Sequence, residues 1–81
     1  MNILFFGNLR EQLGTGQFNY TGSTPNTVGE LRLALQQSNP DWQLPLADNN
    51  VLFAVNQNMA DENTPISAND EIAFFPPVTG G

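Results

Sequence analysis

The two ends of the chain carry its most apolar segments, and this placement constrains the fold more than any other feature. Residues 2–7 read Asn-Ile-Leu-Phe-Phe-Gly, and residues 71–75 read Glu-Ile-Ala-Phe-Phe. Short runs of consecutive apolar residues are typical of strands that are covered on both faces. A chain of 81 residues has room for only one modest core. We therefore expect one domain in which the first and last strands lie side by side at the centre of a single sheet.

The middle of the chain predicts further strands and turns. Residues 17–21 alternate between polar and aromatic side chains and predict a second, antiparallel strand. Residues 8–16 contain two glycines and are interpreted as the connection of a hairpin between these strands. Residues 41–46 predict one short helical turn. Residues 51–56 predict a third strand, which a turn joins to a brief edge segment that carries Met59.

One main helix is expected to begin after Thr27. Thr27 and Glu30 have the spacing of a capping box, in which the threonine oxygen accepts from the Glu30 amide and the Glu30 carboxylate accepts from the Thr27 amide. An apolar stripe at helical spacing should pack on the sheet, and it consists of Val28, Leu31, Ala34 and Leu35. The pattern ends at residues 38–40, because the residue before Pro40 is disfavoured in helical conformation.

This order of elements predicts an α+β sandwich of one sheet and one helix. The helix can cover only one face of the sheet, and the strand alternation leaves Phe6, Met59 and Phe75 on the other face. An exposed cluster of aromatic and methionine side chains usually marks an interaction site. The alternative is that loops fold over this face.

The last six residues are expected to form an extended arm beyond the domain of residues 1–75. Proline fixes φ and favours extended backbone, β-branched residues also favour it, and glycine has no Cβ to obstruct a narrow channel. The arm, residues 76–81, consists of Pro76, Pro77, Val78, Thr79, Gly80 and Gly81. The alternative is a frayed terminus without a function.

Composition excludes several classes of function. The chain has no cysteine and no histidine, so it lacks a thiolate nucleophile, the usual general base and the commonest metal ligands, and we expect no metal site. Eight acidic residues against two arginines give a net charge of −6, which disfavours nucleic-acid binding. The acidity suits a basic protein partner or simply aids solubility. Without a membrane-length segment or a secretory signal, we expect a cytoplasmic protein that binds no membrane.

Several segments resemble the small subunit of molybdopterin synthase, within the ubiquitin-like β-grasp fold. The resemblance covers the whole chain and is most specific in the last twelve residues. The matching segments are residues 4–6 (Leu-Phe-Phe), 9–11 (Leu-Arg-Glu), 13–14 (Leu-Gly), 54–57 (Ala-Val-Asn-Gln) and 70–81 (Asp-Glu-Ile-Ala-Phe-Phe-Pro-Pro-Val-Thr-Gly-Gly). The implied fold is a mixed sheet of four to five strands with one main helix packed on one face.

The resemblance implies a sulfur carrier without enzymatic activity of its own. An adenylyltransferase related to ubiquitin-activating enzymes would adenylate the carboxylate of Gly81 with ATP, and a desulfurase or rhodanese would supply the sulfur that converts it to a thiocarboxylate. The large synthase subunit would bind the arm, and the thiocarboxylate would donate sulfur to cyclic pyranopterin monophosphate. The family's synthase is a heterotetramer, and the chain itself would bind no cofactor.

The same resemblance assigns roles to individual residues. Gly80 and Gly81 would enter the channel of the large subunit, Pro76 and Pro77 would direct the arm, and the three residues of the uncovered face would contact the partner. Three alternatives remain: a sulfur carrier for thiamin thiazole synthesis, a protein modifier of the ubiquitin type, and a non-covalent binding module that uses only the aromatic residues.

Overall fold

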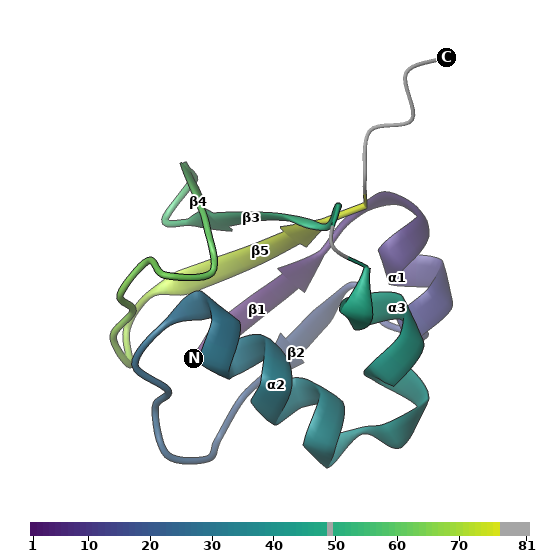
Figure 1. Ribbon diagram of the computed structural model, residues 1–81, viewed down its shortest axis with the longest axis horizontal. Coiled ribbons are helices and arrows are strands. Elements are labelled where there is room, and N and C mark those ends of the chain that lie inside the picture. The colour runs from purple at the N-terminus through teal and green to yellow at the C-terminus, as the bar shows by residue number, and fades with distance from the viewer. Residues whose placement is uncertain (49, 77–81) are drawn as a thin grey trace.

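The structure, a computed structural model, describes residues 1–48 and 50–76. A sheet of five strands carries the helices on one of its faces (Figure 1). Its strands lie in the order β2-β1-β5-β3-β4; β1 and β5 run parallel, and the other neighbouring pairs are antiparallel. The strands are β1 (Asn2–Phe5), β2 (Gln17–Asn19), β3 (Leu52–Val55), β4 (Asn58–Ala60) and β5 (Glu71–Phe75).

The first and last strands lie side by side at the centre of the sheet, as predicted. Their register places Ile3 beside Ile72 and Phe5 beside Phe74. All four side chains are almost completely buried beneath the helices. Residues brought together from opposite ends of the chain thus form the middle of the core.

The segment predicted as a plain hairpin connection contains a helix, α1 (Gly7–Leu13). The prediction was wrong because it gave weight to the glycines and not to the spacing of Leu9 and Leu13. These leucines are four residues apart, lie on one side of the helix and are both buried. Gly14, with φ of 78°, ends the helix in the left-handed conformation, and its N–H donates to the Arg10 carbonyl. The flanking strands β1 and β2 are antiparallel neighbours, as predicted.

The main helix α2 (Val28–Ser38) begins at the predicted cap. The Glu30 amide donates to Thr27 Oγ1 at 3.2 Å. The Glu30 carboxylate lies 3.4 Å from the same hydroxyl, which donates to it, instead of accepting from the Thr27 amide as expected. The predicted stripe covers the sheet with Val28, Leu31 and Leu35 buried and Ala34 half-buried.

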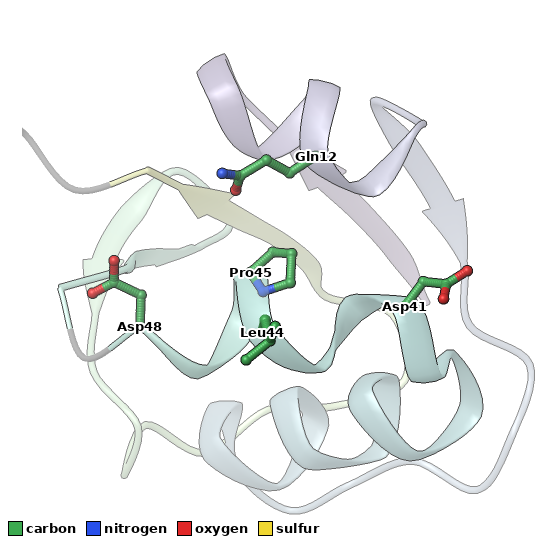
Figure 2. A pocket seen from close by; sticks show the side chains of 5 residues that line it. All are labelled: Gln12, Asp41, Leu44, Pro45 and Asp48. Carbon is green, nitrogen blue, oxygen red and sulfur yellow. The ribbon is translucent and has the colours of Figure 1, made fainter.

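A 3₁₀ turn, η1 (Pro40–Trp42), leads directly into α3 (Gln43–Ala47), so the predicted single turn is longer than expected. Pro45 does not interrupt α3, because it lies in the first turn, where amides have no partner within the helix. The helix α3 contacts both α1 and α2 and lies between them (Figure 2).

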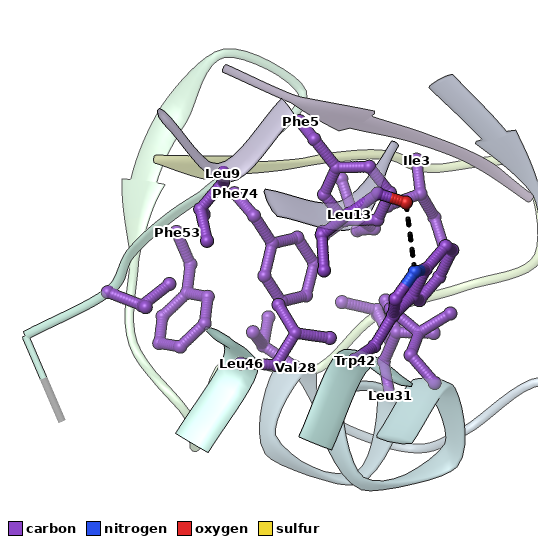
Figure 3. Packing of buried hydrophobic residues seen from close by; sticks show 14 residues of the cluster. Ile3, Phe5, Leu9, Leu13, Val28, Leu31, Trp42, Leu46, Phe53 and Phe74 are labelled. Carbon is purple, nitrogen blue, oxygen red and sulfur yellow. Dashed lines mark hydrogen bonds between the residues drawn. The ribbon is translucent and has the colours of Figure 1, made fainter. Parts of the chain in front are cut away.

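Trp42 contacts both the helices and the sheet. Its ring meets Phe5 and Phe18 edge to face, with centroids 5.4 and 5.2 Å apart. Its indole N–H donates to the Leu13 carbonyl at 3.1 Å, the bond drawn in Figure 3. The carbonyl at the end of α1 is thereby satisfied inside the core.

The architecture is the predicted α+β arrangement of one mixed sheet with its main helix on one face. All described helices and strands lie within the predicted domain of residues 1–75. Of the predicted arm, only Pro76 belongs to the described part of the chain, and residues 77–81 lie outside it. Among the described helices, none is long and apolar enough to cross a lipid bilayer.

Candidate functional site: an apolar patch on the sheet

The face of the sheet away from the helices carries a group of large apolar side chains. The register pairs Phe75 with Leu52 and Phe5 with Phe74, and the Phe6 amide donates to the Phe74 carbonyl at 3.1 Å. Phe6, Phe75 and Leu52 therefore form a row across three adjacent strands or their ends. Together with Met59 and Pro76 they line one apolar groove of about 400 Å³, and these five residues are called the apolar patch.

Small residues lie beside this row on the same face of the sheet. Ala73 pairs with Leu4 on one side and with Ala54 on the other, and Ala54 pairs with Met59. Both alanines are nearly fully buried although no helix covers this face. Because their side chains are short, the surrounding large ones can close over them, and this part of the uncovered face is apolar.

The aromatic part of the patch is ordered by direct ring contact. The rings of Phe6 and Phe75 stack with centroids 4.9 Å apart and an interplanar angle of 9°. Phe6 nevertheless remains 41% exposed, Leu52 37% and Met59 68%. Burying one such side chain contributes roughly 1.5–3 kcal/mol, so a partner that covers all of them has enough apolar surface for a stable complex.

The root of the predicted arm lies within the patch. Gly7 has φ of 58°, and a Cβ at this position would lie 2.7 Å from Pro76 Cγ. The absence of a side chain at Gly7 thus lets Pro76 lie against the junction of β1 and α1. A partner that covers the patch would contact the first residue of the arm.

The structure brings together the predicted residues Phe6, Met59, Phe75 and Pro76. Their role in binding a partner stays a prediction. Loops among the described residues do not cover this face, as the exposure of Phe6 and Met59 shows. The other predicted site residues lie outside the described part of the chain: Pro77, Val78, Thr79, Gly80 and Gly81.

Leu52 is the member of the patch that the sequence interpretation missed. Strand alternation within the predicted strand of residues 51–56 puts Leu52 on the face opposite to the one that carries Val51 and Phe53. Its contact with the aromatic row became visible only with the pairing of β3 and β5. No lining residue of the patch is titratable, so the patch can bind by apolar contact but supplies no acid, base or nucleophile.

Comparison with known sequences gives a match over almost the whole chain. The sequence model of the ThiS family matches residues 3–81. The molybdopterin synthase sulfur carrier subunit of Escherichia coli is 41% identical over 81 residues, which are 100% of this chain and 99% of that protein.

Solved structures agree with the fold. A crystal structure of small archaeal modifier protein 1 from Haloferax volcanii has a TM-score of 0.81 and 26% identity, covering 100% of this chain and 98% of that one. In a complex of subunits 1 and 2 of the molybdopterin-converting factor from Helicobacter pylori, the matched chain has a TM-score of 0.64 and 30% identity, covering 99% of this chain and 96% of that one. The predicted ubiquitin-like β-grasp fold is confirmed by these likenesses and by the strand order.

Proposed function

The chain belongs to the ThiS family, and we propose that it is the sulfur carrier of a molybdopterin synthase. The observation that carries the proposal is the position of Pro76 on the apolar patch. The segment that follows Pro76 begins at the surface best suited to bind a partner. If a partner enzyme binds the patch, the arm up to Gly81 would therefore lie next to the active site of that partner.

The first proposed partner is the large subunit of the synthase. The similarity to one chain of the Helicobacter pylori complex of subunits 1 and 2 supports this choice. The side chains of Phe6, Leu52 and Met59 would be buried in the contact, and the arm would extend into the large subunit. In the resulting heterotetramer, one carrier would bind at each end of a dimer of large subunits.

The chemistry would take place at the carboxylate of Gly81, because no residue of the patch can act as a nucleophile or base. An activating enzyme related to ubiquitin-activating enzymes would transfer AMP from ATP to this carboxylate and release pyrophosphate. A persulfide whose sulfur originates from a desulfurase or rhodanese would then displace AMP and form an acyl disulfide, and a thiol would reduce this disulfide and leave a thiocarboxylate. The thiocarboxylate is itself a nucleophile, and it would donate its sulfur to cyclic pyranopterin monophosphate.

The arm would position the reacting group through its backbone. Pro76 and Pro77 restrict φ and favour an extended chain, and Val78 and Thr79 continue the extended preference. Gly80 and Gly81 present no side chains to a narrow channel. The carrier would bind no cofactor, and ATP would be bound by the activating enzyme.

Two related functions compete with this one. The family match includes carriers of the thiamin pathway, which would use the same terminal chemistry with a different large partner. The likeness to small archaeal modifier protein 1 favours a modifier whose Gly81 is joined to a lysine of a target. The identity to the Escherichia coli sulfur carrier subunit, 41% against 26% for the archaeal modifier, supports the synthase role.

The decisive measurement is the intact mass of the chain after incubation with ATP, the activating enzyme and a sulfur donor. We expect a gain equal to the exchange of one oxygen for one sulfur atom. A chain that lacks Gly81 is the matched control and should gain nothing while keeping its fold. The charged chain should then convert cyclic pyranopterin monophosphate when the large subunit is added.

Other outcomes would select the alternatives. Charging followed by sulfur transfer only to the thiazole-forming enzyme would assign the chain to thiamin synthesis. Linkage to target lysines would indicate a protein modifier. Full cellular function of the chain without Gly81 would identify a non-covalent binding module and overturn every carrier reading.

A further inference from the structure

A second surface with binding character lies on the helical side of the molecule. Gln12 of α1 and four residues of η1, α3 and its end line a groove of about 450 Å³. Figure 2 shows Leu44 and Pro45 in the middle of this group, with Asp41 toward one side and Asp48 toward the other. We call this group, Gln12, Asp41, Leu44, Pro45 and Asp48, the acidic groove.

The apolar centre of the groove is unusually exposed. Leu44 has 87% of its surface exposed, whereas Leu46, two residues later in the same short helix, is completely buried. Leu44 also lines a neighbouring groove with Leu33 of α2, which is 54% exposed. Single leucines on a surface are common and need no explanation. Here Leu33 and Leu44 share one groove, which Ala47 and three glutamines also line, so an apolar strip with neutral polar neighbours lies between α2 and α3.

The charge around this strip is negative. The carboxylates of Asp41 and Asp48 line the groove, and no cation does. Neither arginine of the chain lines this groove: Arg32 pairs with Glu62, and the side chain of Arg10 lies over the turn at Gly16. The charges therefore favour a ligand that carries positive charge on both sides of an apolar centre.

The charge of each possible ligand of the acidic groove also indicates which one is favoured. A second copy of this chain, with a net charge of −6, would bring further carboxylates against Asp41 and Asp48. The residues beyond Pro76 contain no basic side chain and would carry a terminal carboxylate. Both occupants are electrostatically disfavoured, whereas a basic segment of another protein is favoured.

We propose that the acidic groove and Leu33 form a second docking surface, which binds a basic amphipathic segment of a partner protein. Large aliphatic side chains of the segment would contact Leu44 and Leu33. Arginines or lysines of the same segment would pair with Asp41 and Asp48. Because this surface belongs to the helical layer and the apolar patch to the opposite face of the sheet, both can be occupied at once. The proposal goes beyond sulfur transfer and does not depend on it.

A titration of the full-length, ¹⁵N-labelled chain followed by NMR tests the proposal. The probe is a short blocked peptide with two leucines flanked on both sides by arginine. We expect amide shifts confined to α3, η1 and the adjoining residues of α1 and α2. Matched peptides with glutamates in place of the arginines, or serines in place of the leucines, should bind at least about tenfold more weakly.

Variants of the chain locate the contact. Leu44→Gln and the double change Asp41→Asn with Asp48→Asn should each weaken the peptide about tenfold, because all three side chains are exposed and their replacement leaves the core intact. Phe75→Ser and deletion of Gly81 should leave peptide binding unchanged. The deletion also separates this inference from the proposed function, since it abolishes charging with sulfur but not docking.

Four results would overturn the proposal. Shifts centred on Phe6 and Met59 would place the peptide on the apolar patch. Equal affinity of the Leu44→Gln chain, or no binding at millimolar peptide, would remove the groove as a docking surface. Shifts at α3 that depend on the concentration of the chain alone would identify a second copy as the occupant.

Discussion

Phe74 and Phe75 are neighbours in β5, yet Phe74 is completely buried under the helices and Phe75 stacks on Phe6 at the uncovered face. Phe5, the last residue of the adjacent strand β1, and Phe6, which follows it with extended backbone, repeat this contrast. The residue type is the same in all four positions, so the difference arises from strand alternation alone. One face of the sheet stabilises the fold, and the other keeps its aromatic side chains available to a partner. Substitutions on the two faces should therefore have separable effects.

Phe74→Ala should have the largest effect on stability. The ring is fully buried and meets Phe53 and Phe5, with centroids 5.3 and 5.7 Å apart. Removal of such a ring costs about 3–5 kcal/mol, which is a large part of the stability of a domain of this size. Urea denaturation followed by circular dichroism measures the change. A loss below about 1 kcal/mol would contradict the assignment of this face as the core.

Phe75→Ser tests the role of the uncovered face of the sheet. Partial exposure of the ring limits its contribution to folding, so the stability should fall much less than in Phe74→Ala. Binding to the large synthase subunit should weaken about ten- to a hundredfold, because the half-buried side chain would be fully buried only in the complex. Calorimetric titration of the two proteins gives this number. An unchanged affinity would show that the apolar patch is not the interface, and Leu44→Gln is the matched exposed control with no expected effect.

Trp42→Phe probes how the helices are held on the covered face. The substitution keeps an aromatic ring near Phe5 and Phe18 but removes the indole N–H that donates to the Leu13 carbonyl. A buried carbonyl without a partner costs about 1–3 kcal/mol. Thermal unfolding should reveal this loss while affinity for the large subunit stays the same. Wild-type stability of the variant would mean that the bond contributes nothing.

Thr27→Ala should have the smallest effect, again confined to the covered face. The Thr27 hydroxyl accepts from the Glu30 amide at the start of α2. Loss of such a cap typically costs about 1 kcal/mol. Thr27→Ser retains the hydroxyl and is the control that should restore stability. If alanine and serine behave alike in denaturation, the cap does not stabilise α2.

Local patterns predicted the elements that depend on residues close in sequence. The cap at Thr27, the α2 stripe and the alternation that separates Phe74 from Phe75 all follow from spacing within a few residues. The helix α1 was missed because Gly14 and Gly16 were interpreted as turn residues, although Gly14 is the left-handed end of that helix. Leu9 and Leu13, at helical spacing before a glycine, were the signal that would have revealed it.

The sequence did not allow us to predict the features that depend on pairing between strands distant in sequence. Leu52 joins the patch because β3 pairs with β5 in a register that places it opposite Phe75, and no local pattern encodes this register. The exposure of Leu44 depends in the same way on how α3 packs between α1 and α2. The predicted patch residues were found because Phe6 and Phe75 border the central strands, whose alternation is unambiguous.

The parallel pairing of β1 and β5 also determines when the chain can fold during synthesis. Among the described strands, β1 is synthesised before the others and β5 after them, yet the two pair with each other in the interior of the sheet. Contacts between residues so distant in sequence form slowly, because a long loop must close before they are gained. A ribosome-bound chain that lacks β5 would expose Ile3 and Phe5 without their partners Ile72 and Phe74. Folding must therefore wait until β5 has been synthesised, and a chain shortened before residue 71 would expose its unpaired core residues to proteases.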